Sequence, residues 1–158
     1  MTIVVGCDEA AFELKEAVKA MLVQDGHAVI DKGVYDTNPV DYPDIAFAAA
    51  GEILSGRAER GVLMCGTGIG MSISANKVPC IRAAVCHDPF STERSRKSND
   101  AQIMCLGARI VAPELAKYLV RLWLACEFEG GGSARKVEKI KQYEQMNREG
   151  ASHAENSK

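Results

Sequence analysis

The alternation of short apolar runs with helical patterns constrains the fold of this chain more than any other feature. Five runs are apolar on both faces of an extended strand, at residues 3–7, 28–31, 61–65, 83–86 and 103–106. Such strands are typical of a parallel sheet that is buried between helices. The rhythm therefore predicts an α/β, three-layer, Rossmann-like fold, with a five-stranded parallel sheet and helices on both faces.

The segments between these runs carry apolar residues at helical spacing. One stripe consists of Leu14, Val18, Met21 and Leu22, and others run through 45–53 and 115–123. We expect helices to end at Asp25-Gly26 and Ser55-Gly56, and Pro113 to occupy a first helical turn. Arg94, Arg96 and Lys97 are expected to form a solvated helix face.

The length of 158 residues suits one domain with one core. We predict a single domain over residues 1–148. Its final helix, at about 133–148, follows three glycines and has little sheet left to cover, so it is expected to pack on a partner subunit. The polar segment 149–158 is expected to be a disordered tail.

Composition excludes several classes of protein. The net charge of -2 gives no reason to expect nucleic-acid or membrane binding, and no apolar run has the length of a membrane span. The N-terminus lacks the features of a signal peptide, which predicts a cytoplasmic protein. The six cysteines include no Cys-x-x-Cys pair, so we expect reduced, mostly buried thiols, with no metal site.

Polar and glycine residues follow four of the predicted strands. They are Asp8 and Glu9 after the first strand, the segment 65–70 after the third, His87 and Asp88 after the fourth, and Gly107 and Arg109 after the fifth. Because ligands of parallel α/β sheets bind at the carboxyl ends of the strands, these residues predict one site at a shared edge.

The segment Cys65-Gly66-Thr67-Gly68-Ile69-Gly70 is the strongest local signal. Its glycines allow a close approach to a ligand, and its amides with the following helix start form a concavity for negative charge. The same pattern also fits a tight turn without a ligand. A helix N-terminus favours the thiolate form of Cys65, although a structural role for a buried cysteine is equally consistent with the sequence. Tyr42, beside Pro43, is expected either to reach this edge or to pack.

A larger set of motifs occurs in order along the chain. It comprises Gly6-Cys7-Asp8, Phe12-Glu13-Leu14-Lys15, Asp41-Tyr42-Pro43-Asp44, the 65–70 segment, Asn76-Lys77, Ile81-Arg82-Ala83, Ser98-Asn99-Asp100, Gly107-Ala108-Arg109 and Glu129-Gly130-Gly131. From residue 3 to about 145 the chain resembles the ribose-5-phosphate isomerase B and galactose-6-phosphate isomerase family.

The resemblance implies an aldose–ketose isomerase that needs no metal or organic cofactor. It also implies a homodimer or tetramer whose active sites are shared between subunits. By resemblance, Cys65 is the base that moves a proton between C1 and C2, and Thr67 helps protons to move between the oxygens. The amides of Gly66, Gly68, Ile69 and Gly70 would stabilise the enediolate.

The resemblance also assigns the groups that bind the substrate. Asp8 and Asn99 would bind sugar hydroxyls, Arg109 would contact the phosphate, and Tyr42 would line the pocket. The remaining candidates are Glu9, Ser98, Arg135 and Lys136.

Several of these positions differ from the family pattern. The family usually has His where this chain has Glu9 and Ser98, and Arg where it has Gly132 and Lys136. Lys136 keeps a charge but lacks the guanidinium fork, and Arg135 is a candidate to compensate. Ser98 lacks the acid–base strength of an imidazole that opens a sugar ring. A tetrose 4-phosphate cannot close a furanose, so D-erythrulose 4-phosphate is a candidate substrate beside ribose 5-phosphate.

Other functions stay open at this stage. The substrate is alternatively a differently phosphorylated or free sugar. From other classes, the chain is alternatively a non-catalytic module that binds sugar phosphates or nucleotides, or a nicotinamide-dependent dehydrogenase. A dinucleotide fingerprint would place its third glycine at position 71, where this chain has Met71.

Overall fold

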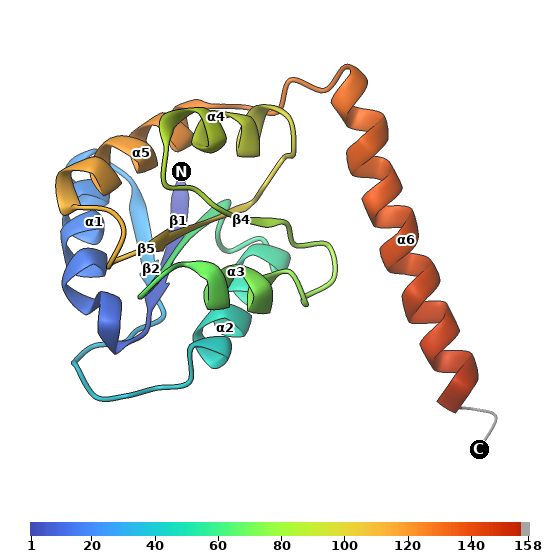
Figure 1. The fold of residues 1–158 in the computed structure, drawn as a ribbon, viewed down its shortest axis with the longest axis horizontal. Helices are drawn as coiled ribbons and strands as arrows, with labels where there is room; N and C mark the ends of the chain where they lie inside the picture. The colour runs from blue at the N-terminus through green and yellow to red at the C-terminus, as the bar shows by residue number, and fades with distance from the viewer. Residues whose placement is uncertain (156–158) are drawn as a thin grey trace.

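The computed structural model of the chain describes residues 1–155 (Figure 1). Its five strands are all parallel, in the order β2-β1-β3-β5-β4. Their bounds are β1 Thr2–Cys7, β2 Ala28–Asp31, β3 Arg60–Cys65, β4 Ala83–Val85 and β5 Ile103–Gly107. The helices are η1 Glu9–Ala11, α1 Phe12–Gln24, α2 Tyr42–Leu54, α3 Ile69–Ala75, α4 Pro89–Lys97, α5 Pro113–Ala125 and α6 Gly132–Glu155. This architecture confirms the predicted fold class.

Helices cover the sheet on both faces, and each face has its own apolar core. On one face, Val5 and Met64 pack with Leu22 of α1 and Trp123 of α5. On the other face, Leu63 packs with residues of α2 and α3. Neighbouring residues of a strand point to opposite faces, so Cys65 belongs to the α2–α3 side together with Leu63.

The helix boundaries follow the predicted signals. The cap of α1 is Asp25, and Gly26 has a φ of 83°, which is a left-handed conformation that suits glycine. The cap of α2 is Ser55, followed by Gly56 with a φ of 73°. Pro113 is the first residue of α5.

The prediction that Arg94, Arg96 and Lys97 form a solvated face of α4 is wrong for Arg96. This side chain is buried, donates to Asp100 Oδ1 at 3.0 Å, and lies 6.0 Å from the centre of the Trp123 ring. A buried guanidinium needs acceptors for its hydrogens, and the Ala101 carbonyl supplies another at 2.8 Å. The periodicity of α4 does not reveal these partners, because they come from the following loop and from α5.

The last helix is longer than expected. The predicted end near 148 is replaced by a helix that continues to Glu155, so part of the segment expected to be disordered is helical. No proline interrupts residues 149–155, and a single glycine at 150 costs only about 1 kcal/mol relative to alanine. The rest of the predicted tail, 156–158, lies outside the described residues. Over residues 1–155, no helix is long and apolar enough to cross a membrane.

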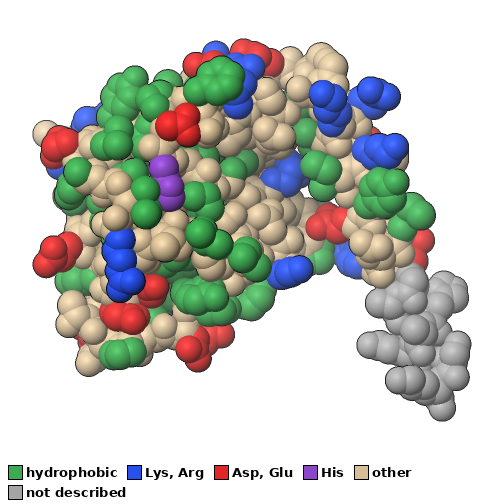
Figure 2. All heavy atoms as spheres, viewed as in Figure 1, with side chains coloured by type: hydrophobic (Ala, Val, Ile, Leu, Met, Phe, Trp, Pro, Cys, Tyr) green, Lys and Arg blue, Asp and Glu red, His purple; other side chains and the backbone are tan. Residues whose placement is uncertain are grey.

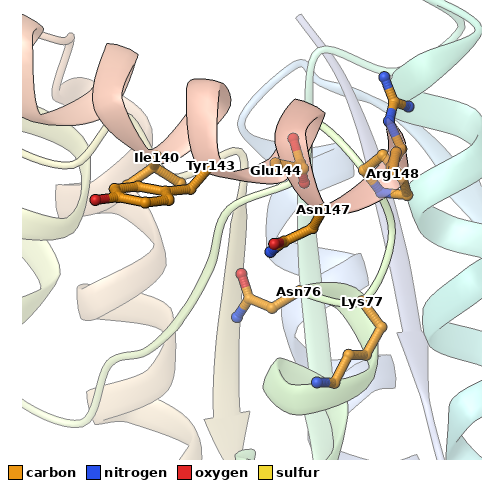
Figure 3. Close-up of a pocket in the computed structure, with 8 residues that line it drawn as sticks. Asn76, Lys77, Ile140, Tyr143, Glu144, Asn147 and Arg148 are labelled. Atoms are coloured by element: carbon orange, nitrogen blue, oxygen red, sulfur yellow. The ribbon is translucent and has the colours of Figure 1, made fainter. Parts of the chain in front are cut away.

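Figure 1 shows α6 standing apart from the α/β body, beyond the amino ends of β4 and β5. Cys80, which precedes β4, donates its amide to Glu144 of α6 at 2.8 Å. A hollow of about 540 Å³ lies between α6 and the end of α3, lined by Asn76, Lys77, Pro79, Ile140, Tyr143, Glu144, Asn147 and Arg148 (Figure 3). Figure 2 shows Lys and Arg side chains gathered on the first half of α6. The hollow is at the opposite end of α3 from Cys65.

Candidate active site

Three adjacent strands bring the predicted residues to one edge of the sheet. In the ladder, Cys7 of β1 pairs with Met64 of β3, and Cys65 pairs with Gly107 of β5. The residues that follow these strands are therefore neighbours: Asp8 after β1, the 66–70 loop after β3, and Arg109 after β5. The expected convergence at the carboxyl edge is present in the structure.

Cys65 is the last residue of β3 and is 5% exposed. The Gly68 amide donates to Cys65 Sγ at 3.1 Å. Thr67 Oγ1 accepts from the Ile69 amide at 3.3 Å, at the start of α3. The sulfur therefore lies within hydrogen-bond distance of a backbone amide and next to the start of α3.

Gly68 shapes the loop around this thiol. Its φ is 77°, a left-handed conformation that residues with a Cβ rarely adopt. A Cβ built on Gly68 would also lie 3.0 Å from the Leu106 carbonyl carbon. Both the turn and the close approach to β5 therefore require glycine at this position.

The turn after β5 holds the loop from the other side. The Ala108 amide donates to the Cys65 carbonyl at 2.9 Å, and the Arg109 amide donates to the Gly66 carbonyl at 3.0 Å. A Cβ on Gly66 would lie 3.5 Å from Cζ of Arg109, so the guanidinium lies over the backbone of the loop. This arrangement puts one positive charge next to the Cys65 loop.

Asp8 and Glu9 lie at the first strand end and face different partners. Asp8 Oδ1 is buried and has no hydrogen-bond partner among the residues described. Burial raises the pKa of the Asp8 carboxyl and Glu9 adds to the rise, whereas the Ala10 and Ala11 amides, and then Arg109, oppose it. Glu9 Oε2 accepts from the Val40 amide at 3.2 Å, which ties Glu9 to the segment before α2.

Tyr42 is the first residue of α2, and Pro43 occupies the first turn as predicted. Its ring lies against the 65–70 loop, because a Cβ on Gly70 would be 2.6 Å from Tyr42 Cζ. Tyr42 is 39% exposed, so it forms a wall of the site and not a core contact.

The other predicted substrate-binding residues lie away from Cys65 within this chain. Because α4 starts at the carboxyl edge and returns across the sheet, Ser98 and Asn99 come to the opposite edge. The Asn99 carbonyl accepts from Arg82 Nε at 3.1 Å, and Arg82 directly precedes β4. Arg135 and Lys136 are exposed on α6, the helix that stands apart from the α/β body in Figure 1.

His87 lies at this site, as the sequence predicts, but the sequence assigns it no catalytic or substrate-binding role. It follows β4, and its Nε2 accepts from the Gly107 amide at 2.9 Å. Its position directly after a predicted strand indicates the carboxyl edge of the sheet. The contact itself depends on β4 lying next to β5, which the sequence pattern does not specify. Among the side chains of residues 1–149, no cluster of His, Cys, Asp or Glu is arranged to hold a metal ion.

Comparison with known proteins identifies the family. Residues 3–140 match the family model described as Ribose/Galactose Isomerase. The D-erythrulose-4-phosphate isomerase of Pectobacterium atrosepticum is 53% identical over 146 residues, which cover 91% of this chain and 95% of that protein. The ribose-5-phosphate isomerase B of Escherichia coli is 44% identical over 140 residues, or 89% and 94% of the two chains.

A solved structure shares the architecture as well as the sequence. The ribose-5-phosphate isomerase B of Clostridium thermocellum superposes with a TM-score of 0.92 at 44% identity, covering 93% of this chain and 99% of that one. Matches of this extent include every strand and the whole Cys65 edge. The chain therefore belongs to the ribose/galactose isomerase family of sugar-phosphate isomerases.

Proposed function

We propose that the protein interconverts D-erythrulose 4-phosphate and D-erythrose 4-phosphate, with Cys65 as the catalytic base. The observation that carries the proposal is the Gly68 amide 3.1 Å from Cys65 Sγ, in a loop that begins a helix. The thiolate takes a proton from C1 of the ketose, and the electron pair moves onto the C2 oxygen as an enediolate. Return of the proton to C2 gives the aldose.

The surrounding groups suit such a charge change. Loop amides between Gly66 and Gly70 are fixed before the reaction, so they stabilise developing negative charge without rearranging. Thr67, an exposed residue of this loop, relays the proton between O1 and O2. A substrate hydroxyl supplies the partner that Asp8 Oδ1 lacks among the residues described.

The tetrose substrate is supported by a relative and by ring chemistry. The 53% identical relative is named a D-erythrulose-4-phosphate isomerase, and so is a 45% identical relative from Mycolicibacterium smegmatis. The C4 oxygen of this sugar carries the phosphate, so the chain stays open. Ser98 in place of a ring-opening imidazole is then no loss.

The active form is a homodimer in which each site takes residues from both chains. Ser98, Asn99, Arg135 and Lys136 lie away from Cys65 of their own chain, so a second copy must bring them. Arg135 and Lys136 then add the positive charge that a phosphate requires, which Asp8 and Glu9 do not provide. A monomeric mass in solution at micromolar concentration would contradict this assembly.

Proton NMR in deuterated water tests the proposal directly. The panel contains D-erythrulose 4-phosphate, ribose 5-phosphate and free sugars, with Cys65→Ala as the inactive control. We expect the tetrulose phosphate to isomerise fastest, with deuterium entering the carbon that receives the proton. Faster turnover of ribose 5-phosphate would favour the second candidate, which relatives named ribose-5-phosphate isomerase B at 44–45% identity support. Binding without exchange of any sugar would favour a non-catalytic module.

A further inference from the structure

His87 makes a contact that belongs to the architecture of the site but to none of the groups assigned so far. The paired register of β4 and β5 ends at Val85 and Cys105, and the Cys86 amide then donates to the Cys105 carbonyl at 3.0 Å. Gly107 lies two residues further along β5. Its amide finds an acceptor in His87 Nε2 at 2.9 Å, so the imidazole extends the ladder by one hydrogen bond beyond the end of β4.

Gly107 transmits this contact to the catalytic loop. A Cβ at position 107 would lie 2.8 Å from the carbonyl carbon and Cα of Thr67, so the two backbones are in direct contact. The next two residues, Ala108 and Arg109, donate their amides to the carbonyls of Cys65 and Gly66. A shift of Gly107 therefore moves the segment that fixes both the thiol and the Arg109 guanidinium.

We propose that His87 is a positioning residue, whose Nε2 holds the turn 107–109 against the Cys65 loop by accepting the Gly107 amide. This role requires a neutral ring with its proton on Nδ1. A protonated ring has a donor on both nitrogens and faces the Gly107 N–H with no acceptor. Protonation of the His87 ring therefore removes the contact.

The surroundings of the His87 ring favour its neutral form near neutral pH. Burial lowers the pKa of His87, and Asp88 at the start of α4 acts in the opposite direction. The Asp88 carboxylate is itself occupied, because it accepts from the Ser91 amide at 2.8 Å as the cap of α4. A further charged group in this region is Arg109, in the turn after β5, and its guanidinium lies over Gly66.

The kinetic test compares variants that keep or remove the acceptor. Glutamine places an oxygen close to the Nε2 position and does not titrate, whereas leucine fills space without accepting. We expect His87→Gln to keep kcat within about threefold at pH 7.5 and to extend activity into acid, and His87→Leu to lower kcat about tenfold or more with little change in KM. His27→Gln, at the amino end of β2, is the matched control. Wild-type kcat in His87→Leu, or equal losses in both variants, would overturn the proposal.

A second test needs no substrate, so it separates failure of this proposal from failure of the proposed function, on which the kinetic test rests. In ¹H–¹⁵N spectra of the wild-type protein, we expect the Nδ1–H tautomer at pH 8 and a Gly107 amide shift that titrates together with the His87 ring. An Nε2–H tautomer, or a Gly107 amide shift that does not change as the His87 ring titrates, would contradict the positioning role of His87. This result decides the question even if His87→Leu does not fold.

Discussion

The Gly68 amide donates to the sulfur of Cys65 across 3.1 Å, within a loop whose geometry only glycine permits at position 68. The thiol and the donor belong to the same short turn, so the position of the donor relative to the sulfur is fixed. Cys65 supplies the thiol and Gly68 supplies the loop conformation, and mutations can test these two contributions separately.

Removing the thiol should abolish turnover without unfolding the protein. We expect Cys65→Ala to lose at least about 10³-fold in kcat, and Cys65→Ser about 10²–10⁴-fold, because a hydroxyl is a poor base at neutral pH. Steady-state kinetics and thermal unfolding of the same samples check this. The exposed Cys80 is the matched control, and Cys80→Ala should keep full activity. Turnover by Cys65→Ala at the wild-type rate would exclude a thiolate base.

Altering the loop should damage stability and activity together. Gly68→Ala places a Cβ at a φ of 77°, which costs about 1–2 kcal/mol in the free energy of unfolding, and crowds the Leu106 backbone. Gly51→Ala is the control within α2, where an added Cβ meets nothing within 4 Å. That change should raise stability by about 0.5–1 kcal/mol. Urea unfolding measures the change in stability of both variants. Equal changes would contradict the left-handed conformation of Gly68.

Stability should depend on pH through Glu52, whose carboxylate accepts from Arg57 and Lys32, both at 2.7 Å. These contacts lower its pKa from 4.5 to about 2. Since the folded-state pKa is depressed, the stabilisation is present above pH 4.5 and is lost as the pH falls towards 2. Glu52→Gln should lower the melting temperature at pH 7, and the gap to wild type should close in acid.

The control for that experiment is Glu114→Gln. Glu114 also pairs with a lysine, at 2.8 Å, but its side chain is 86% exposed, so water screens the interaction. The melting temperature of the Glu114→Gln variant should stay near that of the wild type at every pH. A gap for Glu52→Gln that does not vary with pH would show that the ion pairs are not its cause.

The proposed sharing of active sites between subunits predicts complementation between inactive variants. If Cys65→Ala and Asn99→Ala chains are mixed and allowed to exchange, half of the dimers are mixed and each has one intact site, so roughly a quarter of wild-type activity returns. Refolding or prolonged co-incubation followed by kinetics measures the recovery. Sites formed within one chain would give no recovery, because every chain then carries its own defect.

The sequence predicts the strands and most helix ends because those signals are local: apolar runs, glycines after helices, and Pro113 at a helix start. Contacts that depend on strand order lie beyond such signals. The bond between His87 and Gly107 exists because β4 lies next to β5, and Arg96 is buried because Trp123 and Asp100 lie beside it. The separation of Asn99 from Cys65 likewise follows from the direction of α4.

The strand order also has a consequence for behaviour at high concentration. The two outermost strands are the shortest of the sheet, with four residues in β2 and three in β4. A short outer strand offers few free backbone groups to an incoming strand, which limits continuous sheet extension between molecules. Folded chains should therefore associate through helices and loops, and concentrated solutions should resist conversion into fibres until the outer strands detach.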